Sequence, residues 1–98
     1  MNILKEQNGN ELTLKIEGRL DTSTSPQLEE ELKSALDGIS VLNFDLGALE
    51  YISSAGLRVL LSAQKVMNKQ GSMVVRGANE DIMEIFDVTG FSDILTIE

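Results

Sequence analysis

Two adjacent serines, Ser53 and Ser54, are the residues of this chain with the clearest potential for chemistry. They lie where an apolar strand pattern gives way to an apolar helix pattern. At the start of a helix, free backbone N–H groups and the helix dipole favour negative charge. A serine in this position can cap the helix, act as a nucleophile, or accept a phosphoryl group from another protein. Each role needs different neighbours, so the rest of the sequence discriminates among them.

Intrinsic catalysis lacks a partner for either serine. A serine nucleophile needs a base, but the chain has no histidine, and Lys65 and Lys69 are predicted to be exposed helix residues. Gly47 and Gly56 are also wrongly spaced for a Gly-x-Ser-x-Gly nucleophile motif. Because cysteine is absent too, no imidazole or thiolate is available for a metal. We therefore expect no catalytic residue, no metal and no cofactor.

A structural role for the serines is the simplest alternative. A side chain that caps a helix stabilises the fold by about 1 kcal/mol and needs no function beyond that. The pair follows the carboxyl end of a predicted interior parallel strand, however, and functional sites of open α/β sheets gather at that edge. Asp21 follows another strand and is expected at the same edge, either as a turn or cap residue or as a partner contact.

Composition limits the classes of partner. The formal net charge is -8, from sixteen acidic and eight basic residues, and the sequence pI is about 4.4. Such a surface repels phosphate backbones, which argues against nucleic acid binding. No apolar run approaches the ~20 residues of a membrane span, and no signal-peptide pattern is present. With no cysteine for a disulfide, the expected location is the cytoplasm, without membrane association.

Hydrophobic periodicity and turn residues predict the elements. Alternation at 12–17 predicts a strand, paired with residues 3–4 through a hairpin turn at 8–10. Ser25 as N-cap and Pro26 as first helical residue predict a helix that Gly38 terminates. Further strands are expected at 41–46 and 72–76, and further helices at 54–70 and from Asn79 or Glu80 to Gly90.

The resulting order is ββαβαβα, in which residues 94–97 form either a final strand or a C-terminal docking segment. Strands that alternate with helices indicate a mainly parallel sheet. We therefore predict an α/β fold with four to five strands, an N-terminal antiparallel hairpin and three helices. No repeat or linker divides the sequence, so residues 1–98 are expected to form one domain.

The segment DLGALEYISSAGL at 45–57, with Gly18-Arg19-Leu20-Asp21 upstream, resembles the bacterial anti-sigma factor antagonists of the STAS domain family. The resemblance covers essentially the whole chain, including the order of elements. It implies a single STAS domain and a non-enzymatic regulator. In that family an anti-sigma factor that is also a serine kinase binds the unphosphorylated antagonist and releases its sigma factor. Phosphorylation weakens the complex, and a PP2C-type phosphatase reverses the modification.

The resemblance places the phosphoacceptor on Ser54. The family pattern has an aspartate where this chain has Ser53 and a hydroxyl residue where it has Ala55, so Ser53 is the second choice of acceptor. Arg58, one turn after Ser54, either meets a phosphate or is a solvated helix residue. Tyr51 and Ile52 are either exposed apolar contacts or core residues. The predicted partner-binding residues are Asp21, Thr22, Ser23, Tyr51, Ile52, Ser53, Ser54, Ala55, Gly56 and Arg58.

Other functions fit the same predicted fold. A constitutive scaffold or a transporter-associated STAS subunit would use the domain without phosphorylation. A nucleotide-binding α/β domain is disfavoured because the chain has no Gly-rich phosphate loop. The predicted assembly is a monomer or a weak homodimer, since an edge strand can pair between copies.

Overall fold

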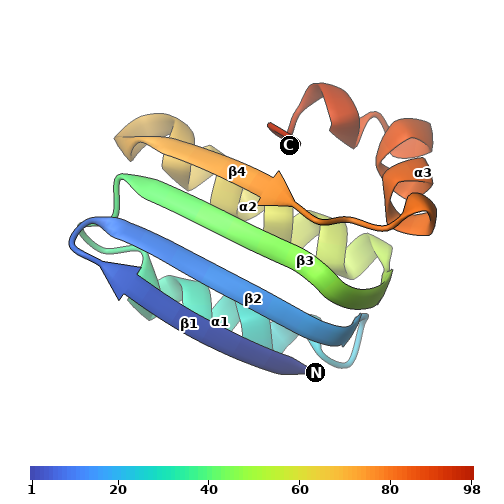
Figure 1. The fold of residues 1–98 in the computed structure, drawn as a ribbon, viewed down its shortest axis with the longest axis horizontal. Helices are drawn as coiled ribbons and strands as arrows, with labels where there is room; N and C mark the ends of the chain where they lie inside the picture. The colour runs from blue at the N-terminus through green and yellow to red at the C-terminus, as the bar shows by residue number, and fades with distance from the viewer.

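Four strands form one mixed sheet with the order β1-β2-β3-β4 in the computed structural model, which describes residues 1–98 (Figure 1). The strands β1 (Asn2–Asn8) and β2 (Glu11–Leu20) pair antiparallel around a turn in which Gly9 has a φ of 62°. The strands β3 (Val41–Ile52) and β4 (Ser72–Arg76) each add in parallel. The predicted hairpin and the mainly parallel sheet are therefore confirmed.

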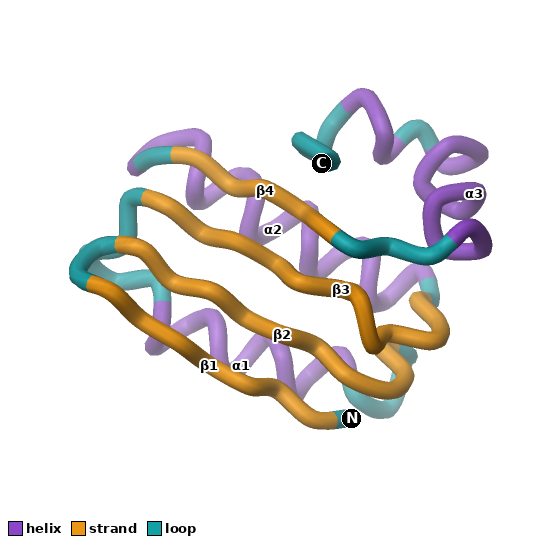
Figure 2. Tube along the Cα trace, in the orientation of Figure 1, coloured by secondary structure: helices purple, strands orange, loops and turns teal.

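Two helices cover one face of this sheet (Figure 2). The helix α1 (Ser25–Ala35) connects β2 to β3, and α2 (Ser54–Gln70) connects β3 to β4. The helix α3 (Glu80–Thr89) and a 3₁₀ turn, η1 (Phe91–Asp93), lie beside β4 at the end of the chain. None of the helices is both long and apolar enough to cross a bilayer.

The core lies between the sheet and the two helices. Leu12, Leu14 and Ile16 alternate along β2 toward the helices and are fully buried, whereas Thr13 and Lys15 between them face the other side. Burial of one such side chain contributes about 1.5–3 kcal/mol to the free energy of unfolding. The other large residues that are fully buried are Leu20 at the end of β2 and, from the rest of the chain, Phe44, Phe86, Leu28, Ile39, Leu42, Leu46, Ile52 and Leu60.

The C-terminal segment forms a bridge rather than a fifth strand. Val75 of β4 donates its N–H to the carbonyl of Thr96 and accepts from the N–H of Glu98, both at 2.9 Å. Only Val75 and Ile97 form a parallel bridge. Of the two alternatives for residues 94–97, the structure therefore shows docking against the sheet edge, and the sheet has four strands.

Several predicted boundaries were wrong: β1 and β2 are longer than 3–4 and 12–17, α1 ends at Ala35 before it reaches Gly38, and two further differences concern Ser25 and β3. Ser25 is the first residue of α1 and not its cap, because the turn before it folds on Asp21: the Ser25 N–H and hydroxyl both donate to the Asp21 carbonyl, at 2.8 and 2.5 Å. The cap position belongs to Thr24, whose side chain makes no capping hydrogen bond. The strand β3 continues to Ile52 instead of ending near residue 46, because its pairing with β2 resumes after two register shifts.

Gly71, at the end of α2, lies in close contact with the backbone of Ser40. A Cβ on Gly71 would lie 1.8 Å from the carbonyl oxygen of Ser40. We expect Gly71→Ala to lower the free energy of unfolding by about 3 kcal/mol or more, because the clash is with backbone and cannot be relieved by a rotamer change. Urea unfolding measures the loss. The control Lys69→Ala, at an exposed position of the same helix, should stay within about 0.5 kcal/mol of the parent.

Candidate functional site

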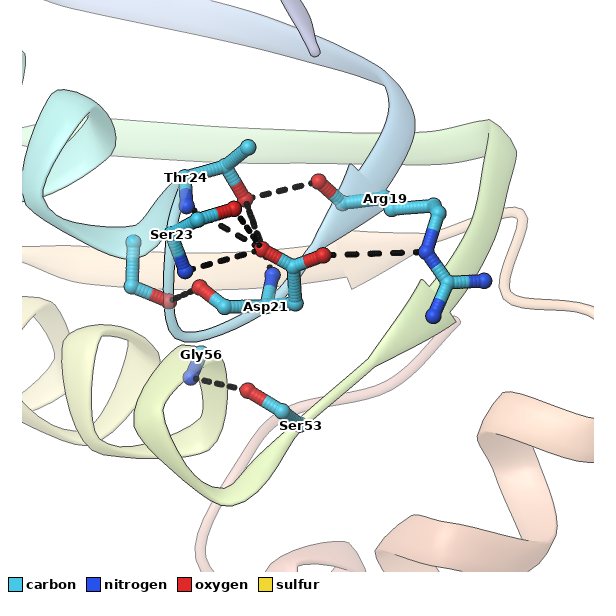
Figure 3. Close-up of polar contacts among 7 residues, drawn as sticks. Arg19, Asp21, Ser23, Thr24, Ser53 and Gly56 are labelled. Atoms are coloured by element: carbon cyan, nitrogen blue, oxygen red, sulfur yellow. Dashed lines mark hydrogen bonds and ion pairs between the residues drawn. The ribbon is translucent and has the colours of Figure 1, made fainter.

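Two connections meet at the carboxyl end of the parallel strands. Leu20, the last residue of β2, pairs in register with Ile52, the last residue of β3. The next peptide continues the contact, because the N–H of Ser53 donates to the carbonyl of Leu20 at 2.9 Å. The turn at 21–24 and the start of α2 are therefore held side by side, as predicted for Asp21 and the serine pair (Figure 3).

Gly56 lets the first turn of α2 approach β2 closely. A Cβ at this position would lie 2.8 Å from Leu20 Cγ and 2.9 Å from both Ile52 Cγ1 and the Leu20 carbonyl oxygen. These distances are shorter than any side chain tolerates without movement of its neighbours. The helix start is thus fixed against the ends of both strands, which sets the position of the serines.

The two serines differ in their surroundings. Ser53 is the N-cap of α2, and its hydroxyl accepts a hydrogen bond from the N–H of Gly56 at 3.4 Å. It is half-buried, whereas Ser54 is the first helical residue and is exposed. No hydrogen bond engages the Ser54 side chain. The capping role therefore belongs to Ser53, whereas the hydroxyl of Ser54 is exposed and is not used by the fold.

The Asp21 carboxylate organises the neighbouring turn (Figure 3). One of its oxygens accepts from the N–H and the hydroxyl of Ser23, at 3.0 and 2.7 Å, and from the N–H of Thr24 at 3.1 Å. The Thr24 hydroxyl donates to the Arg19 carbonyl at 2.8 Å and accepts from the Asp21 N–H at the same distance. This network folds residues 19–24 into one rigid turn.

These hydrogen bonds change the acidity of Asp21. Donation from the Ser23 hydroxyl, followed by the N–H groups of Thr24 and Ser23, lowers the pKa of Asp21 from 3.8 to about 2, against the opposing effect of desolvation. Hydrogen bonds to a carboxylate stabilise its charged form and therefore resist protonation. The carboxylate stays ionised near neutral pH, where it acts as an acceptor for the turn and not as an acid or base.

Arg19 and Tyr51 form a contact that sequence reasoning missed. The Arg19 guanidinium lies 4.4 Å from the centroid of the Tyr51 ring, and its Nε lies 3.6 Å from Asp21 Oδ2. Arg19 and Tyr51 are direct partners in the parallel register of β2 and β3. A cation over an aromatic ring contributes about 0.5–1 kcal/mol at an exposed site. The pair follows from the length and register of β3, which the sequence alone does not specify.

The predicted partner-binding residues divide by exposure. Two of them were wrong as surface contacts: Ile52 is 2% exposed and packs in the core, and Gly56 is buried beneath Leu20. Both residues support the surface from beneath: Ile52 anchors the end of β3 in the core, and Gly56 allows α2 to approach β2 closely. The others are exposed or half-buried, and we call them the serine surface: Asp21, Thr22, Ser23, Tyr51, Ser53, Ser54, Ala55 and Arg58.

A cavity extends the serine surface between the two helices. It has a volume of about 220 Å³ and is lined from α1 by Glu29 among others, from the preceding turn by Thr22, and from α2 by Ala55 and Arg58. Asp45 does not line this cavity; its carboxylate accepts the N–H of Gly47 within β3 at 2.9 Å.

The fold, the paired connections and the serine surface agree with one family. The STAS domain family matches residues 2–98. The chain belongs to the STAS domain family and, within it, to the family of the anti-sigma factor antagonists. It is 32% identical over 98 residues to the anti-sigma-B factor antagonist of Bacillus subtilis, which covers 99% of this chain and 90% of that protein. The corresponding protein of Listeria monocytogenes is 33% identical over 97% of this chain and 85% of its own length.

Solved structures of this family share the fold. An anti-sigma factor antagonist from Mycobacterium paratuberculosis superposes with a TM-score of 0.88 at 23% identity, over 98% of this chain and 83% of that one. The anti-sigma factor antagonist SpoIIAA has been solved unphosphorylated and phosphorylated. The two forms give TM-scores of 0.79 and 0.77 at 13% identity, over 99% of this chain and 87% and 91% of theirs.

Anti-sigma factor antagonists are non-enzymatic regulators, in agreement with the sequence prediction.

The lowered pKa of Asp21 predicts a pH-dependent contribution to stability. A carboxylate with a depressed pKa stabilises the fold fully above its unfolded pKa, near 3.8, and the contribution disappears as the pH falls through about 2. We expect Asp21→Asn to be less stable than the parent at neutral pH and the difference to shrink between these values. Urea unfolding of both proteins over this pH range measures it. A difference that stays constant down to the lowest pH would contradict the assigned network.

Proposed function

We propose that this chain antagonises an anti-sigma factor that is also a serine kinase, and that phosphorylation of Ser54 switches the antagonism off. The unphosphorylated protein binds the kinase through the serine surface and thereby frees a sigma factor. The kinase transfers the γ-phosphoryl group of ATP to the Ser54 oxygen, and the hydroxyl proton leaves to a base of the kinase. A PP2C-type phosphatase hydrolyses the phosphoester and restores binding.

The observation that carries this proposal is the division of labour between the two serines. Ser53 uses its hydroxyl within the fold, whereas Ser54 is exposed and makes no side-chain hydrogen bond. A kinase can therefore reach Ser54 without unfolding the start of α2. The relative SpoIIAA, which has been solved in a phosphorylated form, supports the proposal by family likeness.

The electrostatics of the helix start are consistent with a reversible switch. A phosphoserine carries about -1.5 to -2 charge at neutral pH, and negative charge near a helix N-terminus is locally favourable. The modification therefore leaves the fold intact while it places charge and bulk in the middle of a contact surface. A buried, unpaired charge in an interface costs several kcal/mol, which corresponds to a loss of affinity of about 100-fold or more.

A matched pair of variants separates the two serines. Ser54→Ala should abolish phosphorylation by the cognate kinase and leave the free energy of unfolding nearly unchanged. Ser53→Ala should retain phosphorylation but lower that free energy by about 0.5–1 kcal/mol, because the cap is lost and its hydrogen bond is long. Mass spectrometry after incubation with kinase and ATP maps the modified residue. Phosphate found only outside Ser53 and Ser54 would refute the assigned site.

An acidic substitution tests the effect on the partner. Ser54→Asp should weaken binding to the anti-sigma factor by about tenfold or more, because it places a negative charge in the contact surface. Thermal stability should change little, since aspartate is favourable in the first turn of a helix. Calorimetry with the purified anti-sigma factor measures the affinity, and Ser54→Ala serves as the uncharged control.

A second experiment addresses the constitutive alternative. Affinity capture from the native host should recover a serine kinase with an anti-sigma role. The sigma factor should be absent from the captured complex, because binding of the antagonist releases it. Recovery of a transport complex, with no phosphate on Ser54 under any growth condition, would instead assign the chain to a scaffold or transporter-associated role.

A further inference from the structure

Arg58 is the cation nearest to Ser54 along α2, and it is not committed to any ion pair. Four of the eight basic residues form ion pairs within 4.0 Å, namely Lys5, Arg19, Lys33 and Arg76. Arg19, the other arginine near the serine surface, is already stacked on Tyr51 and paired with Asp21. Arg58 thus remains available to a new anion.

Helix geometry directs Arg58 toward Ser54. Residues four apart lie on neighbouring positions of a helix, with Cβ atoms about 5–6 Å apart, and the later side chain tilts back toward the helix N-terminus. Arg58 also borders the 220 Å³ cavity between α1 and α2. Because Arg58 is exposed and borders open space, its guanidinium can adopt a rotamer directed toward the Ser54 hydroxyl. Glu29 borders the same cavity but forms no ion pair with Arg58 within 4.0 Å.

Two of the backbone N–H groups near Ser54 already donate hydrogen bonds to Ser53. The N–H of Gly56 donates to the Ser53 hydroxyl, and the N–H of Leu57 donates to the Ser53 carbonyl at 2.9 Å. A phosphate on Ser54 has several acceptor oxygens and gains most from a charged donor. A guanidinium presents two parallel N–H groups that match two phosphate oxygens, which a lysine ammonium does not.

We propose that Arg58 binds the phosphate of phosphorylated Ser54 through an ion pair within α2. This inference rests on the function proposed above, since it concerns the modified state of Ser54. Phosphorylation then changes the serine surface twice: it adds a negative group, and it engages the Arg58 guanidinium, which is otherwise a free cation of that surface. A partner that uses Arg58 to bind the unmodified protein loses that contact at the moment the phosphate appears.

The pairing is measured by the second ionisation of the phosphate. The phosphoserine is installed at position 54 during translation, so that no kinase is needed, and its ³¹P chemical shift is followed from about pH 4 to about pH 8. A free phosphoserine has a second pKa of about 6. In the otherwise unchanged protein we expect a value about half a pH unit lower than in the Arg58→Gln variant, because the nearby cation favours the dianion.

The matched control is Lys65→Gln. It removes the same charge from an exposed position of the same helix, eleven residues beyond Ser54 and about 16 Å along the axis. It should leave the phosphate pKa at the value of the parent. The gap between the parent and Arg58→Gln should also narrow in about 0.5 M NaCl, as expected of an exposed ion pair. Thermal unfolding confirms that all three proteins are folded.

The outcomes separate this inference from the proposed function. Equal phosphate pKa values in the parent, Arg58→Gln and Lys65→Gln would overturn the pairing, whatever a kinase does. Failure of every candidate kinase to modify Ser54 would overturn the proposed function but leave the measured pairing intact. A second positive readout is affinity: in the unphosphorylated state, Arg58→Gln should bind the anti-sigma factor about three- to tenfold more weakly than Lys65→Gln does.

Discussion

The contact between the end of β2 and the start of α2 determines the rest of the site. The Leu20 carbonyl oxygen accepts the Ser53 N–H, and it lies only 2.9 Å from the position that a Cβ on residue 56 would take. Parallel pairing of β2 and β3 brings both chain ends to one edge, and the absence of a side chain on Gly56 lets the helix sit directly on them. Without this approach, the turn at 21–24 and the serines would not share a surface.

The chemistry of the site follows from that placement. Ser53 gives its hydroxyl to the helix, Asp21 gives its carboxylate to its own turn, and Arg19 is held between Asp21 and Tyr51. Each of these groups already makes a contact within the protein, whereas the neighbouring Ser54 hydroxyl makes no hydrogen bond. Of the two serines at the start of α2, only Ser54 therefore presents an exposed hydroxyl that the fold does not use.

Much of the fold could be predicted because the local signals agree with the tertiary structure. Alternation marked Leu12, Leu14 and Ile16, and the glycines at 71 and 90 marked the ends of α2 and α3. The failures came where long-range contacts decide. The extension of β3 to Ile52 depends on pairing with β2, and the displaced cap at Ser25 depends on the Asp21 turn.

The candidate site was predictable only in part, for the same reason. The residue types and the helix start indicated both Ser53 and Ser54, and only the family resemblance favoured Ser54. Which hydroxyl caps the helix depends on which one turns back to Gly56, and that required the structure. The burial of Ile52 and the stacking of Arg19 on Tyr51 both follow from strand register, which a single sequence does not specify.

Helix α2 is clamped by backbone at both of its termini. Gly56 abuts Leu20 at one terminus, and Gly71 abuts Ser40 at the other, about 22 Å away along the axis. Both ends of α2 are thus packed against other elements, which opposes a shift of the helix along its axis. A phosphate on Ser54, as proposed above, would accordingly act at the serine surface itself and not through movement of α2.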